Sequence, residues 1–449
     1  MAGMFKAYDI RGLAKDLTDD IAYKIGVGFA RWIKDRKQDA VSIVVGYDMR
    51  ETSPRLAQAL TDGLIDEGLT VVDVGLCSTP MNYFACAQLD AAGSVMITAS
   101  HNPKEYNGFK FCKEDGQSLT YEECIQHIER FVESNKEKPI EPQGPKGSVK
   151  RHDILPDYIG AVVKFADVGR PLKIVADAGN GMAGIEVPPL IENLPDIEVV
   201  PLFFELDGTF PNHEANPVKE ETLGQLSKRV VQENADFGIA FDGDSDRCVF
   251  VGEQGQVITA DLMTALVGQK QIEKHGGGTI LYDLRSSRSV KEAIEAAGGD
   301  AIMCRVGHSY IQSYMKEYDA LFAGELSGHY YFKELYGFDC ALLALQHVIN
   351  IVSSDEEPLS EHIRPLRKYA FSGEINFEVE DVRGTLLRLR ERYADYFDTD
   401  MDGVRFIAPD FWFVVRPSNT EPVVRLTLEA ESEDVMKQKV EEVKAIITS

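Results

Sequence analysis

A serine with basic neighbours follows an apolar stretch near residue 100. The run Gly-Ser-Val-Met-Ile-Thr precedes residues 99–103, which read Ala-Ser-His-Asn-Pro, and the polar loop continues through residues 107–110. A serine hydroxyl is a weak nucleophile unless a base or a positive charge assists it, and His101, Lys104 and Lys110 can supply either. The Gly-x-Ser-x-Gly elbow of esterases is absent from this segment, so acyl transfer is not indicated. Ser100 is therefore a candidate nucleophile, and the alternative is that the Ser/Asn/Pro cluster only forms a turn.

A second polar loop carries aspartates at alternate positions, Asp242, Asp244 and Asp246, between two apolar runs. Three neighbouring carboxylates repel one another unless a cation neutralises them, and hard oxygen ligands favour Mg²⁺ or Ca²⁺. Glu253 falls at the twelfth position of an EF-hand pattern, but Arg247 occupies the sixth, where the sharp turn needs glycine. The sequence therefore predicts a metal site, with an exposed acidic turn as the alternative.

A third loop, residues 324–329, reads Gly-Glu-Leu-Ser-Gly-His after the apolar run Ala-Leu-Phe-Ala. Glu325 and Ser327 have side chains that can hydrogen-bond adjacent sugar hydroxyls. His329 is a candidate proton carrier near neutral pH. A single histidine after a strand is more often a structural hydrogen-bonding group. Without the other loops, His329 would therefore be assigned no catalytic role.

A fourth loop, residues 416–422, reads Arg-Pro-Ser-Asn-Thr-Glu-Pro, and Arg425 follows it. Guanidinium, hydroxyl and backbone N–H groups in one turn suit a phosphate, because charge-assisted hydrogen bonds to phosphate oxygens are strong. The alternative is a proline-rich turn with a solvated Arg416.

The elements around these loops indicate an α/β protein. Short β-branched runs alternate with helical segments such as 20–34 and 54–67 over the first 365 residues, which predicts mostly parallel sheets covered by helices. The predicted strands are 42–45, 71–74, 95–98, 173–177, 198–203, 237–241, 248–252, 278–283, 301–305 and 321–324. Since ligands bind beyond strand ends in open α/β sheets, one loop from each section can face a common cleft.

The chain divides into four sections. A Lys-, Glu-, Pro- and Gly-rich connector, residues 136–147, ends the first, and the pattern changes after Pro365. There, residues 370–379, 403–415 and 423–430 predict antiparallel strands, followed by a charged helix at 433–447. We expect three related α/β domains with mixed, mostly parallel sheets, at 1–147, 148–252 and 253–365, and a C-terminal α+β domain at 366–449, arranged around a central cleft.

Composition excludes several classes of protein. A net charge of −26 and a pI near 4.8 argue against an exposed nucleic-acid groove. The seven cysteines are never in Cys-x-x-Cys spacing and are expected to be buried thiols of a reducing cytoplasm. Residues 74–89 and 340–354 lack charge but are too short to span a membrane, and the second is expected to be a buried helix. The N-terminus lacks an apolar signal-peptide core, so we expect a cytoplasmic protein.

The four loops, in this order and with Phe-Lys-Ala-Tyr-Asp-Ile-Arg-Gly at residues 5–12, resemble the α-D-phosphohexomutase superfamily. The likeness is to the bacterial phosphomannomutase/phosphoglucomutase branch. It implies four domains around one cleft and interconversion of hexose 6-phosphate and hexose 1-phosphate, of mannose or glucose or both. It also implies Mg²⁺, a phosphoserine and a hexose 1,6-bisphosphate intermediate.

The resemblance assigns expected roles residue by residue. Ser100 matches the phosphorylated serine, and a phosphoserine oxygen is expected to complete a Mg²⁺ site with Asp242, Asp244 and Asp246. Glu325 and Ser327 match sugar-hydroxyl contacts. The residues that match the phosphate-binding loop are Arg416, Ser418, Asn419, Thr420 and Arg425. The residues that match other cleft-lining positions are Tyr8, Arg11, His101, Lys110, Arg247, Arg285, His308 and His329.

Three positions depart from the pattern of many relatives. Ser245 replaces Gly, which changes the backbone freedom of the loop more than its ligand count. Leu326 stands where this branch often has Met but stays apolar, unlike the Gln of the glucosamine-type branch. Arg285 stands where some relatives carry Lys, which permits a bidentate contact.

Several expectations stay open at this stage. Lys110 or His101 is the candidate general base on one side and His329 on the other, and spacing does not choose between them. The C-terminal domain, joined near residues 364–369, is expected to close over the cleft and exclude water. The alternatives are a phosphoglucosamine mutase on the same scaffold and a non-catalytic divalent-cation-binding protein. The expected partner is a hexose phosphate, without nucleic acid or membrane, for a monomer or a homodimer.

Overall fold

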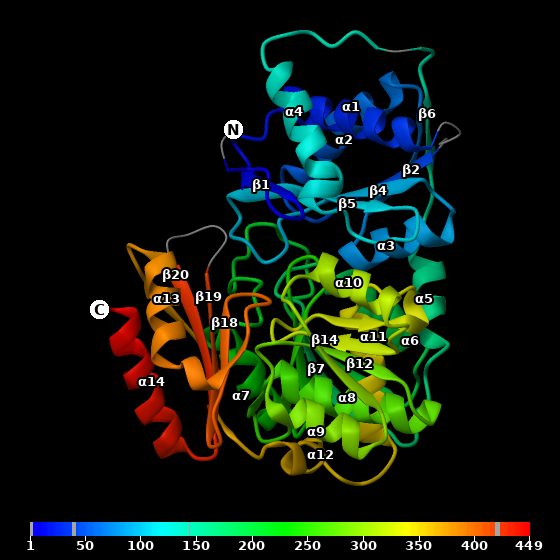
Figure 1. The fold of residues 1–449 in the computed structure, drawn as a ribbon. Helices are drawn as coiled ribbons and strands as arrows, with labels where there is room; N and C mark the ends of the chain where they lie inside the picture. Colours follow the sequence, from blue (N-terminus) through cyan, green and yellow to red (C-terminus); the bar gives the residue numbers. More distant parts are fainter. Residues whose placement is uncertain (1–2, 38–41, 143, 418–422) are drawn as a thin grey trace.

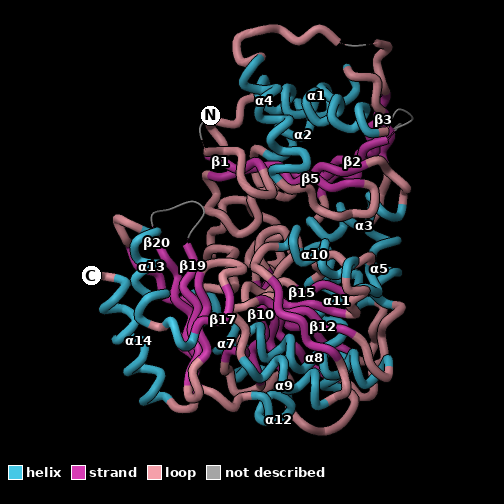
Figure 2. The backbone as a smooth tube through the Cα atoms, in the orientation of Figure 1, coloured by secondary structure: helices cyan, strands magenta, loops and turns pink. Residues whose placement is uncertain are grey.

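The computed structural model describes residues 3–37, 42–142, 144–417 and 423–449. In these residues, four separate sheets follow one another along the chain. Figure 1 shows the first section, blue to cyan, at the top, the two middle sections below it, and the C-terminal section, orange to red, beside them. Figure 2 shows loops gathered where the sections meet.

The first sheet has six strands in the order β1-β5-β4-β2-β3-β6. Strands β4, β2, β3 and β6 run parallel, β5 pairs antiparallel with β4, and β1 pairs antiparallel with β5 at the edge of the sheet. The strands are β1 (Ile10–Leu13), β2 (Ser42–Tyr47), β3 (Thr70–Leu76), β4 (Gly93–Ile97), β5 (Tyr106–Lys113) and β6 (Ser148–Arg151). The helices are α1 (Asp19–Arg36), α2 (Ser53–Asp66), α3 (Thr79–Gln88) and α4 (Gln126–Ser134), the last preceded by a π-helical turn at Tyr121–Ile125.

Strand β5 corrects one expectation, because residues 107–110 lie in a strand and not in the polar loop. Asn107 and Gly108 have low strand propensity, which hid this element from the sequence pattern. The glycine has a packing reason, since a Cβ at Gly108 would lie 2.4 Å from the backbone oxygen of Ile10 on the neighbouring strand β1. The strand carries Lys110 into the site from a rigid element.

The second and third sections also have mixed sheets, in the orders β11-β10-β9-β7-β8 and β13-β12-β14-β15. Strands β8, β7 and β9 of the second sheet run parallel, as do β13, β12 and β14 of the third, with β8 and β13 at the sheet edges. The strands are β7 (Leu172–Asp177), β8 (Ile197–Leu202), β9 (Phe237–Phe241), β10 (Cys248–Gly252), β11 (Val257–Ile258), β12 (Thr279–Asp283), β13 (Asp300–Cys304), β14 (Phe322–Gly324) and β15 (Tyr330–Phe332). The helices are α5 (Leu155–Val163), α6 (Ala183–Glu192), α7 (Gly224–Glu233), α8 (Ala260–His275), α9 (Arg288–Ala296), α10 (His308–Glu317), α11 (Ala341–Ser353) and α12 (Leu359–Ile363).

The C-terminal section is an antiparallel sheet in the order β16-β20-β19-β18-β17 with two helices. The elements are β16 (Ala370–Glu378), α13 (Val382–Arg392), β17 (Phe397–Thr399), β18 (Val404–Ile407), β19 (Phe411–Pro417), β20 (Val423–Ala430) and α14 (Glu433–Ile447). The single strand expected at 403–415 is instead a hairpin of β18 and β19. Its turn is closed by the Ala408 N–H, which donates to the Phe411 carbonyl at 2.8 Å.

The hydrophobic interior is shared unequally among the sections. One large cluster runs from Val44 in the first section through the second to Leu366 at the end of the third, and the buried helix α11 lies within it. The C-terminal sheet has its own cluster, and a small group of Leu284, Trp412 and Val414 joins it to the third section. Burial of apolar area is the main favourable term in folding, so the first three sections are held together far more strongly than the fourth is held to them.

All seven cysteines are buried free thiols, as expected. Within residues 3–37, 42–142, 144–417 and 423–449, no helix has the length and apolar character that crossing a membrane requires.

Candidate active site

Ser100 lies just after β4, in a loop whose conformation is held by the side chain of a buried arginine. Its backbone φ of 50° is in the left-handed region, which a residue with a Cβ rarely adopts without compensating contacts. The buried Arg50 provides them. Its Nη2 donates to the carbonyls of Ser100 at 2.8 Å and Asn102 at 2.7 Å, and its Nη1 donates to those of Pro103 at 2.9 Å and Tyr106 at 3.0 Å. One guanidinium thus satisfies four carbonyl groups of the loop.

The hydroxyl of Ser100 meets groups from two sections of the chain. Ser100 Oγ donates to Asp242 Oδ2 at 2.8 Å and lies 3.1 Å from His101 Nδ1. The close approach requires glycine in the opposing loop, because a Cβ at Gly243 would lie 2.6 Å from the Ser100 carbonyl oxygen. Burial, followed by the charges of Arg247 and Arg11, lowers the pKa of His101 well below its usual value. His101 is therefore neutral and able to accept a proton.

The aspartate loop between β9 and β10 turns its carboxylates inward. Asp242 Oδ1 accepts the N–H groups of Asp246 at 3.1 Å and Arg247 at 3.2 Å, which holds the turn together. One oxygen of each of Asp242, Asp244 and Asp246 lies within 4.8 Å of the others. Burial, together with the charges of Asp246 and Asp244, raises the pKa of Asp242 well above its usual value. The loop therefore concentrates more negative charge than its surroundings offset.

Lys110 reaches this loop from β5. Its Nζ lies 2.8 Å from Asp244 Oδ2 and 2.6 Å from Asp246 Oδ2. Burial alone would lower the pKa of Lys110, but Asp244 and Asp246 raise it well above its usual value. In this arrangement Lys110 is a counter-charge for the aspartates and a poor proton acceptor.

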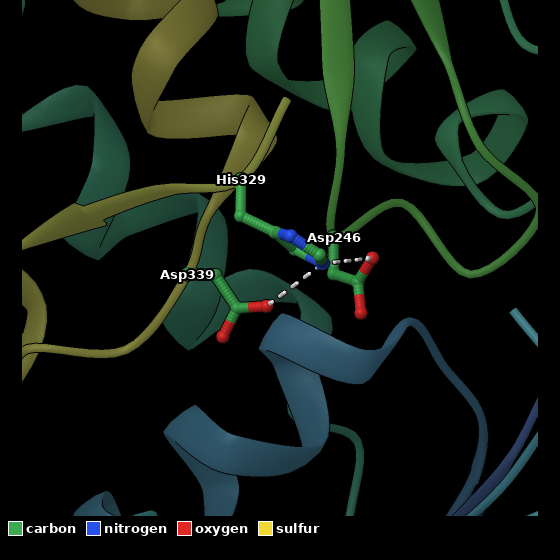
Figure 3. Close-up of side chains that lie close together, drawn as sticks. All are labelled: Asp246, His329 and Asp339. Atoms are coloured by element: carbon green, nitrogen blue, oxygen red, sulfur yellow. Dashed lines mark ion pairs between the residues drawn. The ribbon is translucent and has the colours of Figure 1, made fainter. Parts of the chain in front are cut away.

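His329 lies beyond β14 between carboxylates of two loops, as Figure 3 shows. Its Nε2 is 3.5 Å from Asp246 Oδ1 and 3.8 Å from Asp339 Oδ2, and Arg247 Nε approaches the same nitrogen at 3.1 Å. Burial and Arg247 lower the pKa of His329, but Asp246 and Glu325 outweigh them and raise it to about 9. His329 is therefore protonated at neutral pH, the opposite of His101.

Glu325 and Ser327 lie in the same loop but differ in how far their side chains are already hydrogen-bonded within the protein. Glu325 Oε1 accepts the Gly307 N–H at 3.0 Å, and Oε2 accepts the Tyr331 hydroxyl at 2.7 Å. Ser327 Oγ lies 3.0 Å from His329 Nδ1 and borders the cavity described below. Both oxygens of Glu325 thus already have protein donors, whereas Ser327 is open to a ligand.

Three arginines converge on Glu374 of β16. Arg285 Nη1 and Arg425 Nη1 each lie 3.4 Å from a Glu374 oxygen, and Arg416 Nη1 lies at 3.9 Å. Arg285 also forms a bidentate pair with Asp283, and Arg416 pairs with Asp402 at 2.9 Å. Such a cluster can grip a phosphate. Ser418, Asn419 and Thr420 lie outside the described residues.

The remaining predicted residues line the first and third sections. Arg11 donates through Nη1 to Asn102 Oδ1 at 2.9 Å, beside the Ser100 loop. The Tyr8 and His308 rings lie in an edge-to-face arrangement with their centroids 4.6 Å apart. The centroids of the His308 and His329 rings are 6.4 Å apart. Burial lowers the pKa of His308 to about 3, so this imidazole is neutral.

A cavity of about 900 Å³ lies where the sections meet. Its lining includes groups from all four, among them His101, Arg247, Arg285, Ser327 and Arg425. A second cavity of about 1210 Å³ is lined by Tyr8, Arg11 and Asn102. The first cavity thus collects predicted residues from all four sections, whereas Tyr8 and Arg11 border the second cavity.

Sequence reasoning missed Arg50, Asp339 and Glu374. Arg50 follows β2 in Gly-Tyr-Asp-Met-Arg, where a charged pair after a buried strand was a usable signal. Asp339 lies two residues before the apolar helix α11, and since acidic residues are favoured near helix N-termini, its sequence position gave no sign of a contact with His329. Glu374 belongs to a strand with alternating exposure, and nothing in its sequence context distinguishes it from a surface residue.

Comparison with known proteins agrees with this geometry. Models of the phosphoglucomutase/phosphomannomutase family match domain I at residues 2–139, domain II at 156–255, domain III at 257–369 and the C-terminal domain at 374–446. The chain belongs to the phosphoglucomutase/phosphomannomutase family. A phosphomannomutase/phosphoglucomutase from Pseudomonas aeruginosa is 39% identical over 444 residues, covering 97% of this chain and 94% of the relative. A phosphomannomutase from Methanocaldococcus jannaschii is 37% identical, covering 99% and 97%.

A solved structure shares the whole architecture. The phosphoglucomutase/phosphomannomutase family protein of Burkholderia thailandensis superposes with a TM-score of 0.89 at 33% identity, covering 99% of this chain and 96% of that one. The chain is therefore a hexose phosphate mutase, an isomerase of carbohydrate metabolism. Since it is an enzyme, the alternative of a non-catalytic cation-binding protein is set aside.

Proposed function

We propose that this mutase carries a phosphoryl group on Ser100 and exchanges it between O1 and O6 of glucose and mannose phosphates. The observation that supports this most directly is the position of Ser100 Oγ, 2.8 Å from Asp242 in the second section and 3.1 Å from His101. The names of the curated relatives, which include glucose and mannose, support the choice of substrates.

We also propose that Asp242, Asp244 and Asp246, with a phosphoryl oxygen on Ser100, hold Mg²⁺. The residues fit such an ion because Asp244 Oδ1 and Asp246 Oδ1 are buried and have no hydrogen-bond donor among the described residues. Carboxylate oxygens are the ligands that Mg²⁺ prefers. A bound Mg²⁺ supplies positive charge against the roughly −1.5 to −2 charge of a phosphoserine.

The residues of the chain then have separable tasks. In the first transfer, a sugar hydroxyl oxygen forms the new bond to phosphorus while the bond to Ser100 Oγ breaks, giving a hexose 1,6-bisphosphate. In the second, Ser100 Oγ takes the other phosphoryl group back. Because catalysis of phosphoryl transfer is mostly positioning and charge neutralisation, the arginines near the reacting group matter more than any single base.

Protons must still move with the oxygens. The neutral His101 lies 3.1 Å from Ser100 Oγ and is placed to exchange a proton with it. We propose that His329, whose pKa the flanking carboxylates raise to about 9, gives its proton to the sugar oxygen that leaves in the second transfer, while His101 accepts the proton of Ser100 Oγ. The first transfer reverses both proton movements: the neutral His329 left by the preceding turnover takes the proton of the attacking sugar hydroxyl, and the protonated His101 returns its proton to Ser100 Oγ. Lys110 is then a counter-charge, because Asp244 and Asp246 hold its proton.

The phosphate that is not reacting is proposed to bind at Arg285, Arg416 and Arg425. Their guanidinium groups already surround the Glu374 carboxylate, which supports an anion site in this part of the cleft. Ser327 and Glu325 are proposed to contact sugar hydroxyls in both orientations of the sugar. Seven buried free thiols support a cytoplasmic location.

The test of the phosphoryl carrier is Ser100→Ala, assayed with saturating Mg²⁺ and glucose 1,6-bisphosphate. Turnover should fall by about 10³-fold or more, as for loss of a covalent nucleophile. Intact mass measurement after incubation with the bisphosphate should show one added phosphate on the wild type and none on the variant. Wild-type turnover by Ser100→Ala would refute the proposal.

The sugar is tested separately by comparing kcat/KM for mannose, glucose and glucosamine 1-phosphates. Leu326 is apolar, unlike the Gln of the glucosamine-type pattern, so glucosamine 1-phosphate is expected to be the poorest substrate. A preference for glucosamine 1-phosphate would assign the chain to the alternative activity.

A further inference from the structure

A buried carboxyl group lies behind the aspartate loop. Glu186 of α6 is fully buried, and among the described residues its hydrogen-bond donors are two hydroxyls, Ser78 Oγ and Ser245 Oγ, the latter at 2.7 Å. Burial raises the pKa of Glu186 to about 7, while the two serines lower it. Burying a carboxyl group costs free energy. The burial of Glu186 with two uncharged hydrogen-bond donors therefore suggests that the carboxyl has a structural role.

The two serines belong to different sections of the chain. Ser78 caps the N-terminus of α3 by accepting the Met81 N–H at 3.2 Å, and it donates its own proton to Glu186. Ser245 stands between two of the aspartates with a backbone φ of 63°. Glu186 therefore links the start of a first-section helix to the aspartate loop of the second section.

A direct contact runs beside this link. The Thr79 N–H donates to the Asp244 carbonyl at 3.0 Å, and Thr79 Oγ1 donates to Asp244 Oδ2. With Lys110 on the same oxygen, Asp244 Oδ2 is occupied, and the buried Oδ1 is left without a donor. The helix start thus selects which oxygen of Asp244 is free.

We propose that Ser78, Glu186 and Ser245 are positioning residues that hold the aspartate loop in its cation-binding conformation. This rests on the proposed Mg²⁺ site. Ser245 adopts a left-handed conformation that disfavours any residue with a Cβ, and its hydroxyl bond to Glu186 compensates for that strain. Glycine would adopt this conformation freely but could not form the hydrogen bond. The serine is less free in its backbone, but its hydroxyl connects the aspartate loop through Glu186 to α6 and to the start of α3.

The bridge acts on the metal and not on the sugar. Among the described residues, the side-chain hydrogen bonds of Glu186 are to Ser78 and Ser245, and none is to a residue assigned to the sugar or its phosphates. Arg285 and Ser327, which border the cavity, are held by other partners. Loss of the bridge should therefore change affinity for Mg²⁺ while leaving affinity for the hexose phosphate nearly unchanged.

The experiment measures Mg²⁺ binding directly by calorimetry on the full chain, alongside kcat and KM for glucose 1-phosphate at saturating Mg²⁺. The variants are Ser245→Gly, whose backbone tolerates φ of 63°, and Glu186→Gln. Because partners of metal ligands tune affinity by about 10–100-fold, and this bridge is one step further removed, Kd for Mg²⁺ should rise about tenfold in both. KM at saturating Mg²⁺ should change less than about twofold, since uniform binding of the sugar is untouched.

Ser360→Ala is the matched control, because Ser360 Oγ donates to Glu253 Oε1 at 2.6 Å in a Ser–Glu pair remote from the aspartates. Its Mg²⁺ affinity should equal that of the wild type. Unchanged Mg²⁺ affinity in Ser245→Gly overturns the inference even if Glu186→Gln fails to fold. Asp244→Asn separates the two proposals, because unchanged binding in that variant contradicts the metal site itself, whereas weakened binding there with normal Ser245→Gly contradicts only the bridge.

Discussion

At the residue scale, two histidines of the site differ in charge at the same pH. His101 is kept neutral by burial and by Arg247 and Arg11, whereas carboxylates raise the pKa of His329 to about 9. Environments that push the pKa values of two groups apart are typical of acid and base partners. In the proposed mechanism His101, beside Ser100, exchanges a proton with the serine oxygen, and His329, in the loop of Glu325 and Ser327, exchanges one with the sugar oxygen.

Replacement of His329 tests the second of these roles. His329→Gln should lower kcat by about 10²-fold or more, the usual contribution of a positioned proton carrier. Steady-state assays at saturating Mg²⁺ measure this, with thermal unfolding to confirm the fold. His275→Gln, at the exposed end of α8, is the control and should leave kcat unchanged. Equal kcat in both variants would contradict the assignment.

A third histidine gives a pH dependence of stability away from the site. His213 Nε2 lies 3.1 Å from Asp177 Oδ2. Burial lowers the pKa of His213, but the hydrogen bond and charge of Asp177 outweigh it and raise the pKa above its usual value. A raised folded-state pKa contributes stability that is fully present below the unfolded-state pKa and is lost as pH rises through the folded-state value.

His213→Asn should therefore destabilise the protein by about 1 kcal/mol at pH 6, and the difference should shrink toward pH 9. Thermal unfolding at several pH values measures it. His152→Asn is the control, because that imidazole is partly exposed and lies 3.7 Å from an exposed Asp157. If the loss of stability in His213→Asn grows with pH, Asp177 does not raise the pKa of His213.

At the element scale, strong periodicity made most strands and helices predictable. Apolar runs such as β9 and β10 and the charged helix α14 lie where the sequence placed them. Strand β5 was missed because Asn107 and Gly108 carry the signature of a turn, while tertiary contact with β1 and β4 decides their conformation. The hairpin of β18 and β19 was read as one strand because its turn, Ala-Pro-Asp, is short.

The loop beyond β4 provides a test of how one side chain supports an element. Arg50→Met removes the donor to four carbonyls and leaves Asp48 without its partner. The cost should be about 3–5 kcal/mol, as for a broken buried pair, with a lower first thermal transition and reduced kcat. Arg55→Met, which removes an exposed pair with Asp19, should cost only about 0–1 kcal/mol. Similar losses in the two variants would refute the role of Arg50.

At the scale of the whole molecule, the sequence predicted which loops lie close together but not which side-chain contacts connect them. The resemblance placed Ser100 and the aspartates in one cleft, and the structure brings them within hydrogen-bond distance. It did not reveal that Glu374 gathers arginines from two sections, or that Asp339 stands beside His329. Such contacts join positions far apart in the chain, and no local pattern records them.

The junction of the fourth section is tested at Glu429. Its Oε1 accepts from Trp412 Nε1 at 2.7 Å and from Arg288 Nε at 3.0 Å, so it ties β20 to α9. Glu429→Ala leaves both donors unpaired and should cost about 2 kcal/mol. An earlier thermal transition and faster proteolysis at residues 367–369 are expected. Glu431→Ala, whose exposed carboxylate lies 3.4 Å from Arg288, should behave as the wild type, and equal behaviour of the two variants would contradict the role of Glu429.

The separate interior of the C-terminal sheet has an evolutionary consequence. Phe406, Phe413 and Leu428 pack among themselves, and among the described residues the apolar contact with the third section is the small group around Trp412. Mutations inside this quarter can be compensated locally, without repacking the other three. The C-terminal section, whose arginines are proposed to bind phosphate, can therefore accept mutations, or be exchanged whole by recombination, without repacking the interior of the first three sections.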